Sequence, residues 1–171
     1  VGDYREDLSP AKYTADGALL VQEGDSIQTV VENSGDIDTV EVAAGTYDDS
    51  VTISNPNITI KGPYADTPGH DSARDENEAI INGQIRFDAA DVAVTGFTID
   101  EPEGGFAETK HGIELNSAPG VEIRNNIVRK SEESTFGIGT NNGLAGDATI
   151  AGNYVKNGPV AGVAVLSDKS R

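Results

Sequence analysis

The sequence lacks cysteine, methionine and tryptophan, and aromatic residues make up only 5% of its 171 residues. Without cysteine, disulfides and thiol-ligated zinc or iron–sulfur sites are excluded. The hydrophobic fraction of 36% lies below the ~45–50% usual for globular proteins. The chain is long enough for one domain, so its core must consist of small aliphatic side chains.

Basic residues are also scarce, because 12 lysines and arginines face 29 acidic residues for a formal net charge of −17. Nucleic acids and anionic membranes both require basic surfaces, so the charge argues against either partner. No run of about 18 apolar residues is present that could span a membrane. So acidic a surface is typical of salt-adapted proteins, in which ions screen self-repulsion, and we expect a halophilic source.

Short hydrophobic segments alternate with polar residues along the chain. Residues 1–25 are expected to form an extension ending in a first strand. Residues 26–35 are expected to form a short helix, because Ile27 and Val31 are spaced i, i+4 behind a capping Ser26. Beyond Gly35 the chain consists of alternating runs bounded by turn residues, which is typical of short strands. These runs are 39–42, 50–53, 57–60, 84–87, 92–94, 113–115 and 121–123.

Two gapless alignments reveal internal repeats in the second half of the chain. The first aligns 91–99 with 120–128 and 147–155, and the second aligns 112–115 with 137–140 and 162–165. Two strand types that each recur every 25–29 residues indicate stacked coils rather than a sandwich or a barrel.

Residues that occupy the same position in the aligned repeats form columns, and two of these columns predict a corner of the coil. Gly96, Asn125 and Gly152 share one column, where positive φ is tolerated, and Asn126 and Asn153 share the next, where side chains can bond along the stack.

Outward strand positions form two strips on different faces. Arg86 is expected beside Glu114 on a strip that then continues with small residues and loses its polar groups. Glu122 and Arg124 are expected to form a local, weak ion pair on another face.

The opening segments carry a family resemblance, in Ser26-Ile-Gln-Thr-Val-Val, Thr39-Val-Glu-Val-Ala-Ala-Gly-Thr-Tyr47 and Val51-Thr-Ile53. They resemble the start of NosD-like and pectinesterase-like proteins in the pectin-lyase-like group of right-handed parallel β-helices. The resemblance implies an all-β, single-stranded parallel β-helix over 36–171, whose N-terminal end is capped by the short helix. It also implies that residues 45–47 turn between early strands. Members include lyases, esterases, hydrolases, tailspikes and adhesins, so the fold alone implies no one function.

Our first functional interpretation is a non-catalytic extracellular module with a structural or glycan-recognition role in a cell-surface or virion protein, requiring no cofactor. Candidate ligand residues are Tyr64, Phe106 and His111. They lie in or beside the long polar loops 62–79 and 100–111, which together with loop 129–136 are expected to wall a groove.

The alternative interpretation is a Ca²⁺-dependent polysaccharide lyase, or a related carbohydrate-active enzyme, acting on acidic polysaccharide. Asp100, Glu101 and Glu103 are the candidate Ca²⁺ ligands, and Asp100, Lys110 and Arg124 are the candidate catalytic residues. A chain this acidic also produces such clusters by chance, so a solvated acidic loop is the simpler explanation.

A third interpretation is a subunit of a stacked or trimeric fibre. No cap is evident after the last strand near 161–165, so we expect the C-terminal end to be open, with self-association or further chain covering it. Separately, Asn57-Ile58-Thr59 is the only N-glycosylation sequon. It falls within an expected strand, and twelve asparagines produce about one match by chance.

Overall fold

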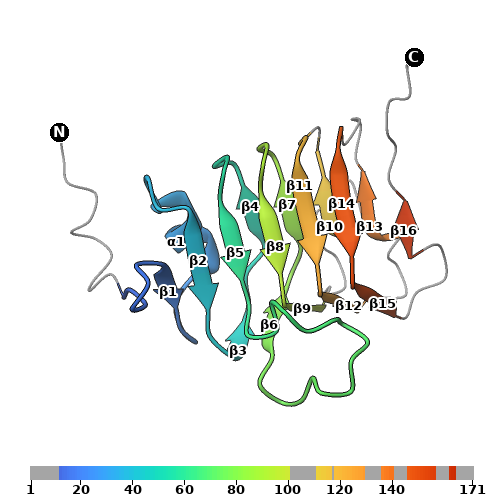
Figure 1. The fold of residues 1–171 in the computed structure, drawn as a ribbon, viewed down its shortest axis with the longest axis horizontal. Helices are drawn as coiled ribbons and strands as arrows, with labels where there is room; N and C mark the ends of the chain where they lie inside the picture. Colours follow the sequence, from blue (N-terminus) through green and yellow to red (C-terminus); the bar gives the residue numbers. More distant parts are fainter. Residues whose placement is uncertain are drawn as a thin grey trace.

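A computed structural model describes residues 12–100, 111–116, 118–129, 136–140, 146–156 and 162–164. Within them the chain forms one helix and three sheets of parallel strands, and the strands of each sheet lie side by side along the long axis (Figure 1). Sheet A contains β1 (Leu19–Val21), β2 (Thr39–Val42), β5 (Thr59–Lys61), β8 (Ala93–Thr95), β11 (Val121–Arg124) and β14 (Ala148–Ala151). Sheet B contains β3 (Gly45–Tyr47), β6 (Ala79–Asn82), β9 (Thr98–Asp100), β12 (Ile127–Arg129) and β15 (Tyr154–Lys156). Sheet C contains β4 (Val51–Ile53), β7 (Ile85–Phe87), β10 (His111–Leu115), β13 (Phe136–Thr140) and β16 (Val163–Ala164).

From β2 onwards, successive strands enter sheets A, B and C in rotation, and each pairs in parallel with its equivalent one repeat later. Ala93 pairs with Glu122 and Glu122 with Thr149, at offsets of 29 and 27 residues. Ile113 pairs with Ile138 at an offset of 25. Both sequence alignments are therefore confirmed, together with an all-β parallel fold.

Inward side chains of the three sheets meet in a single aliphatic core. Strand alternation places every second residue inside, and many of these residues are at most 2% exposed. They include Val40, Ile60, Val94, Ile123, Ile81, Ile99, Val128, Ile53, Phe87 and Leu115. Each such burial contributes about 1.5–3 kcal/mol, so this core compensates for the low hydrophobic fraction.

Helix α1 (Ile27–Glu32) begins where the sequence predicted, because the Ser26 hydroxyl accepts a hydrogen bond from Thr29 N at 3.1 Å. Ile27 and Val31 are its buried residues. Gln28 contacts β4, the terminal strand of sheet C: its Nε2 donates to Thr52 O at 3.2 Å, and its Oε1 accepts from Thr52 N at 2.7 Å. The amide thus supplies the donor and acceptor of a missing neighbouring strand, and the helix caps this edge.

Three local expectations need correction. The segment Gly45–Tyr47, expected as a turn, forms β3 and pairs with β6. The loop expected over 62–79 ends one residue earlier, because Ala79 is the first residue of β6, and β5 begins at Thr59 rather than at 57. Segments of three or four residues carry too little periodicity to show their state, so the neighbouring strand decides it.

The predicted corner is confirmed. Gly96, Asn125 and Gly152 have φ of 82°, 56° and 66°. In the adjacent column Asn126 Nδ2 donates to Asn153 Oδ1 at 3.1 Å, so the asparagines bond along the stack. The expectation of an open C-terminal end concerns residues 165–171, which lie outside the described residues.

Candidate functional site

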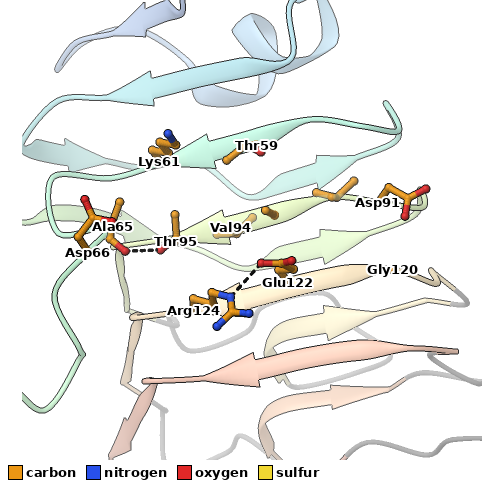
Figure 2. Close-up of a pocket in the computed structure, with 12 residues that line it drawn as sticks. Thr59, Lys61, Ala65, Asp66, Asp91, Val94, Thr95, Gly120, Glu122 and Arg124 are labelled. Carbon is orange, nitrogen blue, oxygen red and sulfur yellow. Dashed lines mark hydrogen bonds and ion pairs between the residues drawn. The ribbon is translucent and has the colours of Figure 1, made fainter.

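An open hollow of about 490 Å³ lies on the outward face of β5, β8 and β11 (Figure 2). We call it the sheet A groove. A second hollow of about 430 Å³ adjoins it towards β2 and shares Lys61, Ala65 and Asp66 with it. The floor and walls therefore extend across successive repeats rather than along one strand.

The register arranges the floor of the groove in two rows. Lys61 pairs with Thr95 and Thr95 with Arg124, while Thr59 and Glu122 flank Ala93 in the second row. Strands lie about 4.8 Å apart, so the backbones of Lys61 and Arg124 are separated by about 9.6 Å. The small side chains between them keep the middle of the floor low, with hydrogen-bonding groups on both sides.

One wall is the backbone around Ala65. Thr95 Oγ1 donates to Ala65 O at 2.8 Å, and Asn125 Nδ2 donates to the same oxygen at 2.7 Å. Two successive repeats thus hold one carbonyl, and the wall is fixed against the floor.

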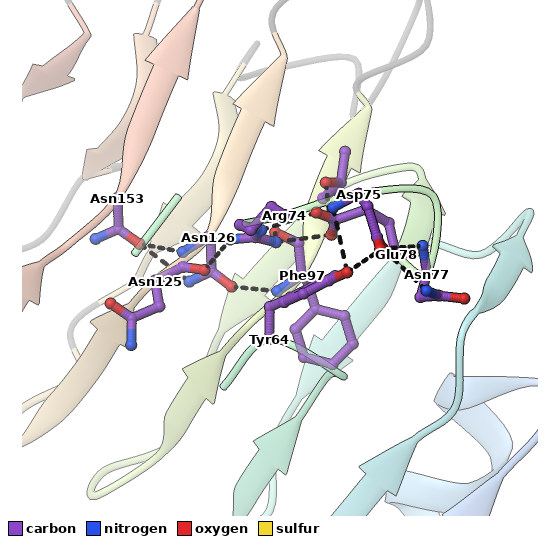
Figure 3. A network of polar contacts seen from close by, with 10 residues as sticks. Tyr64, Arg74, Asp75, Asn77, Glu78, Phe97, Asn125, Asn126 and Asn153 are labelled. Carbon is purple, nitrogen blue, oxygen red and sulfur yellow. Dashed lines mark hydrogen bonds and ion pairs between the residues drawn. The ribbon is translucent and has the colours of Figure 1, made fainter. Parts of the chain in front are cut away.

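The wall belongs to the loop between β5 and β6, residues 62–78. A buried ion pair within this loop holds it in place (Figure 3). Arg74 donates to Glu78 through Nε at 2.8 Å and through an Nη at 2.7 Å, and the two side chains are 2% and 9% exposed. The same guanidinium donates to Phe97 O at 3.2 Å, and Thr98 Oγ1 donates to Glu78 at 3.0 Å. Each charge therefore has several partners, as burial requires.

Tyr64, a predicted ligand residue, belongs to this loop rather than to the groove lining. The guanidinium of Arg74 lies 5.0 Å from the centre of its ring, and its hydroxyl makes a short hydrogen bond with Asp75. That bond raises the pKa of Tyr64 and lowers the pKa of Asp75. The observed contacts of Tyr64 thus orient the loop.

Charges of both signs line the sheet A groove. Arg124 Nε lies 2.9 Å from Glu122 Oε2, which confirms the predicted pair, and the two side chains are 44% and 49% exposed. An ion pair so exposed contributes little to stability, about 0–1 kcal/mol, so both groups stay available to a ligand. Lys61 makes no ion pair within the described residues, and Asp66 lines the groove next to Ala65, at the same end of the strands as Lys61 (Figure 2).

The other predicted site residues are dispersed. Asp100 lies on β9 in sheet B, 3.5 Å from Arg129, so it faces away from Arg124 in sheet A. Lys110, Glu101, Glu103 and Phe106 lie outside the described residues. Across the part of the chain that is described, no three His, Asp or Glu side chains are grouped so as to hold a metal ion.

His111 is the first residue of β10 in sheet C, and it lies next to the row of Glu114, Gly139 and Ala164. A Cβ on Gly139 would lie 2.9 Å from both Cδ2 and Nε2 of His111, so the imidazole covers that glycine. Glu114, opposite Gly139, is 1% exposed and lies 2.9 Å from Arg86. The Arg86–Glu114 neighbourhood is confirmed, and the row continues with Gly139 and Ala164 as expected. The sequence did not show that the buried imidazole of His111 packs over Gly139. The one sequence signal for the packing of His111 on Gly139 is that a glycine follows Glu114 in the row.

Comparison with protein-family models, with curated protein sequences and with solved structures found no match to the chain. Among the described residues, no helix is both long enough and apolar enough to cross a membrane. The function is therefore inferred from the geometry of the sheet A groove.

Proposed function

We propose that the chain is a right-handed parallel β-helix of the pectin-lyase-like kind, acting as a non-catalytic extracellular module that recognises a glycan. The rotation of strands through three parallel sheets supports the fold, as does the helix at one end. The right hand follows from the strong preference of parallel crossover connections, about 98%. The net charge of −17 supports a salt-rich environment.

The observation that carries the function is the sheet A groove, whose floor offers donors and acceptors on three successive strands. A sugar chain lying across β5, β8 and β11 would meet Lys61 and Thr59, then Thr95, then Arg124 and Glu122. Carboxylates, hydroxyls and cations together suit the many hydroxyl groups of a glycan. A wall already held in place lowers the entropic cost of binding.

The way the charges are held supports recognition without cleavage. A glycosidase needs two facing carboxyl groups, and a general acid acts best in a site from which water is excluded. Three carboxylates line the groove, those of Asp66, Asp91 and Glu122. Glu122, on the floor, is about half exposed and paired with Arg124. It suits hydrogen bonding to hydroxyls rather than proton transfer.

Binding to a panel of neutral and acidic polysaccharides, measured by affinity electrophoresis in molar salt, tests the proposal. Ala93→Tyr should fill the floor and weaken binding at least tenfold. Thr149→Tyr is the matched control, because Thr149 continues the same row on β14 outside the groove. Equal binding by both variants, or no binding by folded wild type, would refute glycan recognition in the groove. New reducing ends formed with Ca²⁺ would instead favour the lyase.

A further inference from the structure

The sequon Asn57-Ile58-Thr59 lies in a different setting from the one its sequence suggested. Asn57 precedes β5 and sits in an exposed turn with φ of 59°, while Thr59 is the first residue of the strand. The intervening Ile58 is buried in the core, at 2% exposure. The amide of Asn57 and the hydroxyl of Thr59 therefore both stand on the outside, as alternation requires.

Asn57 begins a column of left-handed residues at one end of sheet A. It aligns with Asp91, and Asp91 aligns with Gly120, whose φ values are 55° and 72°. A Cβ on Gly120 would lie 2.1 Å from Oδ1 of Asp91, so the Asp91 side chain folds over that glycine.

The opposite corner repeats this arrangement. A Cβ on Gly152 would lie 2.2 Å from Oδ1 of Asn125, so the Asn125 side chain folds over the next repeat there too. In both cases the side chain is accommodated because the following repeat has a glycine.

Asn57 is the exception, because the residue after it in the column is Asp91, whose Cβ occupies the space that a glycine leaves open. The Asn57 side chain is exposed and makes no hydrogen bond within the described residues. A left-handed Asn normally gains from local side-chain bonding, and here that gain is missing. Its amide is therefore held out to solvent within the one sequon of the chain.

We propose that Asn57 is an N-glycosylation acceptor. Its Nδ2 would form a bond to the anomeric carbon of a lipid-diphosphate-linked oligosaccharide. The bond from that carbon to the diphosphate oxygen breaks, the lipid diphosphate leaves with the electron pair, and the amide loses one proton. The proposal rests on the extracellular location proposed above but not on ligand binding in the groove.

Mass spectrometry of peptides from the exported protein, purified from the cells that make it, tests this acceptor. The peptide containing Asn57 should carry whole sugar residues, whereas the left-handed Asn125 should be unmodified. Asn57→Asp keeps a residue type that this column already tolerates and should abolish the modification. Thr59→Val should also abolish it, and Thr59→Ser should retain it.

An unmodified Asn57 peptide in exported protein would overturn the acceptor and leave the location intact. Unmodified protein retained in the cytoplasm would overturn both. Neither result bears on binding in the sheet A groove, which the Ala93→Tyr comparison tests separately.

Discussion

Two faces of the molecule carry an arginine–glutamate pair at the same distance and use it differently. On sheet A, Glu122 and Arg124 lie 2.9 Å apart within one strand and are about half exposed. On sheet C, Arg86 and Glu114 lie 2.9 Å apart across two strands, and Glu114 is 1% exposed. Distance alone therefore says little about an ion pair. Burial decides whether it supports the fold or remains available to a ligand.

The largest effect is expected where both charges are buried. Glu78→Gln leaves the Arg74 guanidinium buried without its countercharge, so the free energy of unfolding should fall by about 3–5 kcal/mol. Urea denaturation measures it. Asp100→Asn is the matched control, because that carboxylate faces Arg129 in an exposed pair and should cost about 0.5 kcal/mol or less. Equal losses would contradict the role assigned to burial.

A second test addresses sheet C, where the imidazole of His111 packs closely on Gly139. Gly139→Ala places a methyl group 2.9 Å from the imidazole of His111, and should lower the free energy of unfolding by about 1–3 kcal/mol. In the His111→Ala background the same change should cost less, because the ring is gone. A double-mutant cycle checks this, and purely additive losses would show that the two residues do not touch.

Two tyrosines offer the same contrast between a buried and an exposed side chain, because Tyr47 is buried and Tyr13 is exposed. Burial, reinforced by the carboxylates of Asp25 and Glu23, raises the pKa of Tyr47 to about 12. The folded pKa of Tyr47 exceeds the usual value near 10, so the protonated hydroxyl contributes to the free energy of unfolding. That contribution is complete below pH 10 and is lost as pH rises towards 12.

Tyr47→Phe removes the hydrogen bond to Ala43 O, so at pH 7 it should cost about 1 kcal/mol. It should also flatten the decline in stability above pH 10, measured by urea denaturation at several pH values. Tyr13→Phe, at an exposed position, should leave the alkaline slope unchanged. A wild-type slope in Tyr47→Phe would disprove the assignment.

The smallest change in stability is expected at the exposed pair. Arg124→Gln should alter the free energy of unfolding by about 0.5 kcal/mol or less, while glycan binding weakens severalfold. Binding and unfolding are measured on the same preparation. A large loss of stability with unchanged binding would make Arg124 a structural residue and remove it from the groove.

Much of the fold could be predicted from local and periodic patterns. The alternation in runs such as 121–123 placed Val121 and Ile123 inside, and Ser26 marked the start of the helix. By contrast, the family resemblance implied a turn at Gly45–Tyr47. Three residues show no period that could have corrected this, and only pairing with β6 makes them a strand.

For the candidate site, the sequence identified a contact within one strand but not the contacts between distant segments. Arg124 and its pairing with Glu122 followed from spacing along one strand. The wall at Ala65 did not, because it depends on side chains 30 and 60 residues away in the sequence. Loops have no period from which such contacts could be counted.

By itself, the sequence determined the aliphatic core, the repeat registers and the left-handed corners, because each depends on residue type at a regular spacing. Only the tertiary structure decided that Arg74 reaches across repeats, that His111 covers Gly139 and that Asn57 has no glycine to fold over. Those contacts depend on the space that neighbouring repeats leave, and that space exists only once the repeats have stacked.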